Sequence, residues 1–558
     1  MGSVRIPVFS SRPFVSKSQM TALGILIVSS VLTVVALLAP AQAEKGSSFV
    51  TSHECLACHN GLHTSSGTDV SLGTDWRPTA MANSGRDPYW LASARRETLD
   101  HPKASSAIED ECTICHMPQT TYEARQKGSR GRLFSLVAPA TGGQALHAQD
   151  GVACSVCHQI SKEGLGERKS FIGHYVIARS PDGRRPAFGP HEVTRGLARV
   201  MRSATGFEPT SADHLARSEM CATCHTLFTK ALTPDGQVAG ELPEQVPFLE
   251  WAHSSYRDKR SCQSCHMPPA EDPAPIASVL GEPRDGIARH VFEGGNFVLP
   301  RLLARARHED RVPALPGELE AAAHRAIRHL AESAAAVRIV PSKAARGTLS
   351  FDVVVENHAG HKFPTAYPSR RAWLHVVVRD AQGNVLFESG ALGPDGRIAG
   401  NDNDEDARRF EPHHRVISQP SEVQVYESIM VDAASRVTTG LLSGVRYVKD
   451  NRLLPQGFTK ERAAPEVTVQ GDATSDPDFV GGSDTTRYEV SLAKWVKTQG
   501  PLEVMAELYY QPIGYRWAHT LGTYRSNETE RFIARFQSMA HASASRVASA
   551  KAVVGWEE

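Results

Sequence analysis

A five-residue pattern, C-x-x-C-H, occurs five times in this chain and constrains it more than any other feature. C-x-x-C-H is the attachment signature of c-type haem: the two thiols add to the porphyrin vinyl groups, and the histidine becomes the proximal ligand of the iron. The ten predicted attachment residues are Cys55, Cys58, Cys112, Cys115, Cys154, Cys157, Cys221, Cys224, Cys262 and Cys265. The predicted proximal ligands are His59, His116, His158, His225 and His266.

The cysteine count separates this interpretation from its two alternatives. All 10 cysteines of the chain lie in the five motifs. Structural zinc sites would combine C-x-x-C units in pairs, and five units do not pair evenly. A disulfide framework would scatter cysteines at other spacings. We therefore predict five covalently bound haem c groups and no disulfide.

The N-terminus has the pattern of an export signal. Arg5, Arg12 and Lys17 precede an apolar run from about Leu23 to Leu38, and an A-x-A cleavage pattern follows at 41–43. The alternative is an uncleaved membrane anchor, but the apolar run is shorter than the ~20 residues that a span prefers. We predict a signal peptide over residues 1–43 and a periplasmic or otherwise exported protein. Export also suits c-type haem, which is attached outside the cytoplasm.

Length and charge narrow the class of protein. The chain has 558 residues, which suggests two to four domains, and 41% of them are hydrophobic, which is ordinary for a globular core. The 61 basic and 61 acidic residues balance. Without a basic excess, a nucleic-acid partner is not expected.

The motifs and the hydrophobic periodicity divide the rest of the chain. Residues 44–315 carry all five motifs, whose first cysteines are 57, 42, 67 and 41 residues apart, so we expect a pentahaem domain of short helices and irregular loops. Residues 316–337 repeat apolar side chains at helical spacing and predict a linker helix. Residues 338–536 contain period-two runs separated by turn signals, which predict an all-β sandwich domain. Residues 537–558, rich in Ala and Ser, are expected to be a loose helical or disordered tail.

The sixth ligand of each iron decides between electron transfer and catalysis, because an empty position permits substrate binding. Five proximal histidines leave 19 of the 24 histidines. His147 and His214 each lie seven residues before a motif and His253 lies nine before one, whereas His290 follows all five beside glycines. The distal candidates are Met81, His147, His214, His253 and His290, with His174 and His361 as weaker ones. For each histidine the alternative is a surface or hydrogen-bonded side chain, and for Met81 it is core filling.

The motif region resembles the superfamily of exported multihaem c-type cytochromes that includes cytochrome c-554 and the tetrahaem and octahaem cytochromes. The resemblance is carried by His116-Met117-Pro118, His266-Met267-Pro268, 151–160 and Asp87-Pro88-Tyr89-Trp90. It implies that Met81 is a distal ligand and that the segment around His290 supplies a distal histidine. It covers most of the mature chain but identifies a broad group.

The β region resembles the C-terminal domain of some of these cytochromes, through Asn357-His358-Ala359-Gly360-His361-Lys362-Phe363-Pro364-Thr365 and the following 370–373. Two interpretations of His361 stay open: a distal ligand that reaches into the haem domain, or a hydrogen-bonded loop histidine. His413 and His414 are weaker cases of the same kind. The acidic run 401–406 offers hard oxygens for Ca²⁺ but lacks the full EF-hand pattern.

These patterns predict an exported pentahaem cytochrome that carries electrons to or from redox protein partners. One alternative is a reductase or oxidoreductase that acts on a small nitrogen or sulfur compound at a five-coordinate haem. No motif has Lys in place of its histidine, a substitution used at one kind of nitrite-reducing site. A second alternative is a structural subunit of an extended haem assembly. Membrane association and oligomer formation stay open.

Overall fold

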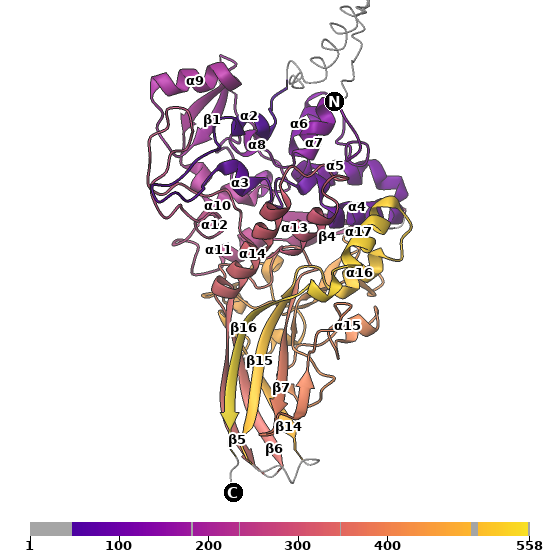
Figure 1. The fold of residues 1–558 in the computed structure, drawn as a ribbon. Coiled ribbons are helices and arrows are strands. Elements are labelled where there is room, and N and C mark those ends of the chain that lie inside the picture. Colours follow the sequence, from indigo (N-terminus) through magenta and orange to yellow (C-terminus); the bar gives the residue numbers. More distant parts are fainter. Residues whose placement is uncertain (1–46, 180–181, 234, 346, 493–499, 556–558) are drawn as a thin grey trace, which may run out of the picture. The chain divides into compact units, whose positions relative to one another are not determined.

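Short helices carry the five motifs, as their spacing predicts (Figure 1). This computed structural model describes residues 47–558 except 180–181, 234, 346, 493–499 and 556–558, so the predicted signal peptide lies outside the described residues. The motif helices are α2 (Ser52–Leu56), α5 (Ser105–His116), α8 (Cys154–Cys157), α10 (Ser218–Ala222) and α12 (Cys262–His266). In the described part of the chain, no helix has the length and hydrophobicity needed to cross a membrane.

Further helices and two small sheets pack around the motif helices. The helices are α3 (Leu72–Trp76), α4 (Pro88–Asp100), α6 (Pro118–Gln126), α7 (Gly143–Gln149), α9 (Arg195–Thr205), α11 (Pro247–Ala252) and α13 (Val298–Arg305). Strands β1 (Arg185–Gly189) and β2 (Phe207–Ser211) pair in parallel, and β3 (Leu227–Leu232) and β4 (Val238–Gln245) pair antiparallel. These four strands lie where only short helices and loops were expected.

The start of α4 shows how a local signal sets an element. The Asp87 carboxylate accepts the backbone N–H groups of Tyr89 and Trp90 at 2.9 and 3.3 Å, and Pro88 occupies the first helical position. Aspartate at the N-cap and proline directly after it are both favourable at a helix start. This cap fixes the position of Trp90 in the first turn of α4.

Helix α14 (Pro316–Ser333) forms where helical spacing was expected, but it ends earlier than residue 337. Leu319, Ala323, Ala326 and Leu330 form its buried face. The helix packs against α13 on the motif side and against β5 and β16 of the β region. Strand β5 (Ala335–Ala345) begins directly after the helix, because residues 335–337 pair with β6.

Two antiparallel-rich sheets make up most of the β region. One has the order β5–β6–β14–β9 and the other β10–β7–β15–β16, with β8 paired to β7. The strands are β6 (Thr348–Asn357), β7 (Arg371–Arg379), β8 (Val385–Ser389), β9 (Val416–Ile417), β10 (Val425–Tyr426), β14 (Ser483–Ser491), β15 (Leu502–Gln511) and β16 (Ser545–Val554). A third sheet contains β11 (Ser428–Val431), β12 (Val437–Thr438) and β13 (Arg446–Asp450).

Buried side chains of the two larger sheets share one hydrophobic cluster. Phe351 and Val353 of β6, Leu374 of β7 and Val504 of β15 all belong to it and have no exposed surface. The alternation of buried and partly exposed residues in β6 and β14 agrees with the period-two pattern of the sequence.

Two expectations for the C-terminal half were wrong. The region is not all-β, because it contains α15 (Asp402–Glu405), α16 (Tyr515–Leu521) and α17 (Asn527–Gln537). Residues 545–554, expected to be a loose helix or disordered, form β16, which pairs antiparallel with β15 along its length. Pairing with the edge of β15 outweighs the weak strand propensity of Ala and Ser in this segment.

Candidate haem-binding site

The motif histidines share one arrangement of their ring nitrogens. Nδ1 of His59 lies 2.5 Å from the Ile276 carbonyl oxygen, and Nδ1 of His158 lies 2.6 Å from that of Phe188. His116 and His266 make the same contact with the carbonyls of Ser84 and Glu293, the former at 3.1 Å. A carbonyl can only accept, so each Nδ1 carries the ring proton and donates it. Nε2 then keeps its lone pair, which is the arrangement that metal-binding histidines use.

Burial favours the neutral form of four of the five motif histidines. Burial lowers the pKa of His116 and of His266 to about 4, and it also lowers the pKa of His158 and His225. Neutral imidazole is the form that binds a metal. His225 has an exposed surface, but the surrounding protein still desolvates its ring. The ring is therefore enclosed by protein without close packing against it.

The cysteines also fit covalent attachment. All ten are free thiols with partly exposed surface, and none is bridged to another. Burial nevertheless raises the pKa of Cys112 and Cys157. Free, enclosed and incompletely packed thiols beside a neutral imidazole are what a covalently bound porphyrin requires at these positions.

His158 faces a second histidine. Its ring and that of His290 are 6.3 Å apart between centroids, with an interplanar angle of 14°. Nδ1 of His290 lies 3.1 Å from the Ala288 carbonyl oxygen, and burial lowers the pKa of His290 to about 4. Both rings therefore have Nδ1 on a carbonyl and Nε2 available.

His266 faces a histidine in the same manner. The ring centroids of His266 and His361 are 6.2 Å apart at an interplanar angle of 10°. Nδ1 of His361 lies 2.8 Å from the Lys362 carbonyl oxygen. His361 comes from the loop after β6, so this pair joins the β region to the motif region.

The separation within the two pairs matches the width of one iron with two axial imidazoles. An imidazole nitrogen lies about 1.1 Å from its ring centroid and a metal–imidazole bond is about 2.0–2.1 Å long, so opposed ligands have centroids about 6.3 Å apart. Direct stacking of two imidazoles would bring the rings much closer, as in the Trp90–His116 stack at 4.0 Å.

Three other predicted distal ligands have different surroundings. His253 uses both ring nitrogens: Nδ1 lies 2.7 Å from the Leu249 carbonyl oxygen, and Nε2 accepts the Ala464 N–H at 3.3 Å. His214 is buried with Nε2 2.8 Å from the Ile160 carbonyl oxygen. His174 has an exposed side chain.

Met81 and His147 lie near the second and third motifs. The Met81 carbonyl accepts the Val152 N–H at 2.9 Å, which ties its segment to the start of the third motif. The Met81 side chain is partly exposed, and His147 is buried in α7. No contact of the Met81 sulfur with a motif histidine is among those that the structure describes.

Two further residues lie beside motif histidines, where they were not predicted. Trp90 stacks on the His116 ring at 4.0 Å and 3°, placed there by the capped start of α4. His329 of α14 lies 5.8 Å from His266 between ring centroids at 48°, with Nδ1 3.4 Å from a Glu293 carboxylate oxygen. The Asp87-Pro88 cap could have located Trp90 in sequence, whereas nothing local signals His329.

The first and third motifs pack together through a serine. Ser52, three residues before Cys55, accepts the Cys154 N–H on its hydroxyl at 3.3 Å. The thiols of Cys55 and Cys154 lie within hydrogen-bonding reach of each other. Helices α2 and α8 are accordingly in contact (Figure 1).

The fourth and fifth motifs repeat this packing. Ser218, again three residues before a first cysteine, accepts the Cys262 N–H at 3.1 Å. The thiols of Cys221 and Cys262 lie within hydrogen-bonding reach, as in the first pair. The shared pattern S-x-x-C-x-x-C-H therefore marks the first member of each pair.

The second motif meets the fourth. The thiols of Cys115 and Cys224 lie within hydrogen-bonding reach. Gly173 lies between them: its N–H donates to the Thr223 carbonyl at 2.6 Å, and a Cβ at this position would be 1.9 Å from a methyl carbon of Ile114. The fourth motif thus contacts both the second and the fifth.

The acidic run 401–406 is used for ion pairs. Asp404 makes a buried two-pronged pair with Arg371 at 2.7 and 2.9 Å. Asp402 pairs with Arg409 and Asp406 with Arg408. Each of these three aspartates already has a cationic partner, so the predicted Ca²⁺ site gains no support here and stays a prediction.

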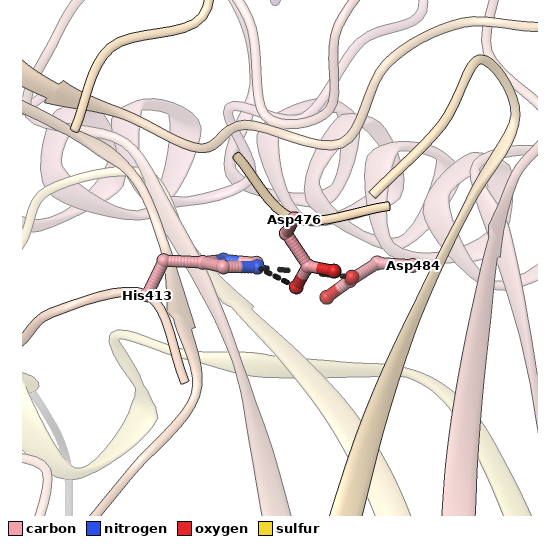
Figure 2. A group of neighbouring side chains, drawn as sticks. All are labelled: His413, Asp476 and Asp484. Carbon is pink, nitrogen blue, oxygen red and sulfur yellow. Dashed lines mark hydrogen bonds and ion pairs between the residues drawn. The ribbon is translucent and has the colours of Figure 1, made fainter. Parts of the chain in front are cut away.

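A buried cluster in the β region, His413 with Asp476 and Asp484, also has metal-ligand chemistry (Figure 2). His413 Nε2 lies 3.0 Å from an Asp476 carboxylate oxygen and 3.9 Å from one of Asp484. One ligand atom from each residue lies within 4.8 Å of the others.

The hydrogen bonds around His413 fix its proton on Nε2. Its Nδ1 lies 3.1 Å from the Gln424 side-chain nitrogen and 3.0 Å from that of Asn451. Both amides are held in this orientation because their oxygens accept backbone N–H groups, of residues 414 and 427. Two donors face Nδ1, so the ring proton is on Nε2 and points at Asp476. A protonated Nε2 cannot bind a metal, and the cluster is a hydrogen-bonded network.

No family model matches the sequence, and no curated protein matches it. Among solved structures, a penta-heme cytochrome c552 from Thermochromatium tepidum is similar, with a TM-score of 0.49 and 16% sequence identity. The similarity covers 91% of this chain and 99% of that chain. At this level the neighbour's properties do not transfer to this chain.

Proposed function

We propose that this protein is an exported pentahaem c-type cytochrome that carries electrons between redox protein partners. The five C-x-x-C-H motifs use every cysteine, and the thiols are free and enclosed without being bridged. Four of the five motif histidines donate Nδ1–H to a carbonyl and leave Nε2 available. Both features are what covalent haem attachment with a proximal histidine requires.

The facing pair of His158 and His290 is the observation that carries the proposal. Two buried imidazoles with both Nδ1 atoms on carbonyl oxygens, ring centroids 6.3 Å apart and an interplanar angle of 14° fit the width of one iron. A bound haem c supplies a one-electron iron couple, and two imidazole ligands favour electron transfer because no coordination position stays open. The residues of this chain hold the rings neutral and oriented.

The remaining ligand assignments are proposals of differing support. We propose His290 as the distal ligand of the third motif, and Met81, His147 and His214 stay candidates for the distal positions of the other haems. His253 is left out of this set because both of its ring nitrogens already have hydrogen-bond partners.

Three further parts of the proposal concern the rest of the chain. The shared hydrophobic cluster of the two larger sheets supports a β-sandwich that shields one end of the haem region or binds a partner. The charge and apolar pattern of residues 1–43 supports export to the periplasm. The two facing histidine pairs, which would leave no coordination position open on the irons between them, support a protein redox partner in preference to a small substrate.

The haem count tests the proposal directly. After expression in a host that attaches haem c to exported proteins, we expect five covalent haem adducts by mass spectrometry and a haem-to-protein ratio of five by pyridine haemochrome absorbance. Cys154→Ser with Cys157→Ser should remove one adduct. Fewer than five adducts on the wild-type chain would overturn the proposal.

A ligand variant tests the His158–His290 pair. His290→Gln should leave five adducts but convert one haem from a low-spin to a high-spin ferric EPR signal, because the iron loses its sixth ligand. His174→Gln, which changes an exposed histidine, is the matched control and should leave the spectrum unchanged. An unchanged spectrum in His290→Gln would contradict the assignment.

A further inference from the structure

The loop between β6 and β7 is fixed on both sides of His361, by hydrogen bonds within the β region and by one to α11 of the motif region. The Asn357 side-chain nitrogen donates to the His361 and Leu453 carbonyls, each at 2.9 Å. The N–H of Lys362 donates to the Glu250 carboxylate of α11 at 3.2 Å, and Phe363 exchanges two backbone hydrogen bonds with Leu453 at 2.9 Å. The backbone at residue 361 therefore has little freedom.

A buried network of four charged residues, called here the Lys362 network, secures the same loop. It consists of Glu250, Lys362, Asp450 and Arg452. Lys362 Nζ lies 2.7 Å from an Asp450 oxygen, and its side chain has 0% exposed surface. Arg452 lies 2.8 Å from Asp450 and 2.9 Å from Glu250, so two cations and two carboxylates balance.

Buried, balanced charge of this kind fixes geometry more than it adds stability. Taking four charged groups out of water is costly, and their attraction roughly offsets that cost. The network instead restricts the orientation of its side chains, because each charged group can meet its partners in only a few positions. Glu250 belongs to the motif region and the other three to the β region, so the network aligns the two regions beside His361.

We propose that His361 is the sixth ligand of the haem iron whose proximal ligand is His266, and that the Lys362 network positions it. This inference rests on the proposed function, since it needs a haem at the fifth motif. Its own support is the 6.2 Å centroid separation, the 10° interplanar angle, and the Nδ1 atoms of both rings on carbonyl oxygens.

His329 is the rival ligand at this position. Its ring is closer to His266, at 5.8 Å, but it is tilted by 48° and turns Nδ1 toward the Glu293 carboxylate. That Glu293 residue also supplies the carbonyl that accepts the His266 Nδ1–H. His329 therefore lies beside the His266–His361 pair, next to Glu293.

The loop offers a matched control for a test. His358 lies three residues before His361 in the same loop, its side chain is 41% exposed, and it faces Glu356 at 3.6 Å. In the purified holoprotein, His361→Gln should convert one of five ferric haems to a high-spin EPR signal, and added imidazole should restore the low-spin signal. His358→Gln and His329→Gln should leave the spectrum as in the wild type.

Two further variants make the outcome decisive. His361→Met should keep all haems low-spin and raise the reduction potential of one, because thioether replaces imidazole. Glu250→Gln should give a partial high-spin fraction that imidazole removes, which a merely structural role would not produce. With five adducts attached, an unchanged spectrum in His361→Gln, or the change appearing in His329→Gln instead, would overturn the inference. Fewer than five adducts in the wild type would instead reject the proposed function.

Discussion

At the scale of single residues, Asp484 is a buried carboxylate with too few donors. One of its oxygens accepts the Tyr426 hydroxyl at 2.8 Å and the Gln424 side-chain N–H at 3.0 Å. The other has no hydrogen-bond partner and lies 3.9 Å from His413 Nε2. Burial therefore raises the pKa of Asp484 above its ordinary value, against the opposing effect of nearby His413.

The raised pKa of Asp484 predicts how the free energy of unfolding changes with pH. The folded protein holds the Asp484 proton more tightly than the unfolded chain, whose carboxyl has a pKa of about 3.9, so unfolding free energy falls as pH rises from about 4 through the raised pKa. Each tenfold difference in proton affinity between the folded and unfolded states corresponds to a loss of about 1.4 kcal/mol. In urea unfolding measured from pH 4 to 8, Asp484→Asn should reduce this decrease of the unfolding free energy with pH. Asp472→Asn, at an exposed carboxylate, should not.

Single residues also show where sequence reasoning stops. The motif cysteines and the histidines proposed as proximal ligands are explicit in the sequence, because spacing alone specifies them. Distal histidines are not, because nearness in sequence is a poor guide: His253 lies nine residues before a motif, yet its nitrogens bond elsewhere. His361 lies far along the chain but faces His266.

At the scale of elements, the turn at Gly173 lets the second and fourth motifs approach. Its φ is +69°, in the left-handed region that favours glycine, and a Cβ would overlap Ile114 at 1.9 Å. Any side chain at this position would force the two motifs apart.

Gly173→Ala should therefore destabilise the holoprotein by more than about 2 kcal/mol, since backbone strain and overpacking add. Gly128 has the same φ of +69° with nothing within 4 Å of its Cβ position. Gly128→Ala should cost only the strain, about 1 kcal/mol. Thermal unfolding followed by circular dichroism compares the two, and equal destabilisation would show that the Ile114 contact is unimportant.

Elements with strong local signals were predictable, and elements set by pairing were not. The motif helices and α14 follow from spacing and apolar periodicity. Strand β16 does not, because Ala and Ser have little strand propensity and its place depends on the free edge of β15. The four short strands of the motif region likewise depend on partners distant in sequence.

At the scale of the whole molecule, the two predicted regions are joined more extensively than a linker helix suggests. Helix α17 packs against α4, with a two-pronged Arg95–Glu528 pair at 2.9 and 3.0 Å. The Glu97 carboxylate accepts the backbone N–H groups of Leu441 and Leu442 at 2.9 and 3.3 Å. Residues Ser48–Glu558 accordingly form one compact unit.

Removal of the last strand tests this integration. Deletion of residues 545–558 leaves the edge of β15 unpaired and uncovers the core around β5 and β15, including the place of buried Val547. We expect loss of cooperative unfolding and a high-spin signal from the haem of the fifth motif, because the β region no longer holds His361. Deletion of residues 555–558 alone is the control, and a similar loss there would contradict this explanation.

The position of β16 also orders events during biosynthesis. A ribosome delivers the N-terminal motifs first and the residues of β16 last, so the sheet that contains β15 cannot close until the entire polypeptide has emerged. The segment that carries Cys55 to Cys265 is complete long before that moment. On the proposal that these cysteines bind haem, their thiols are therefore open to attachment before the β region can close over them.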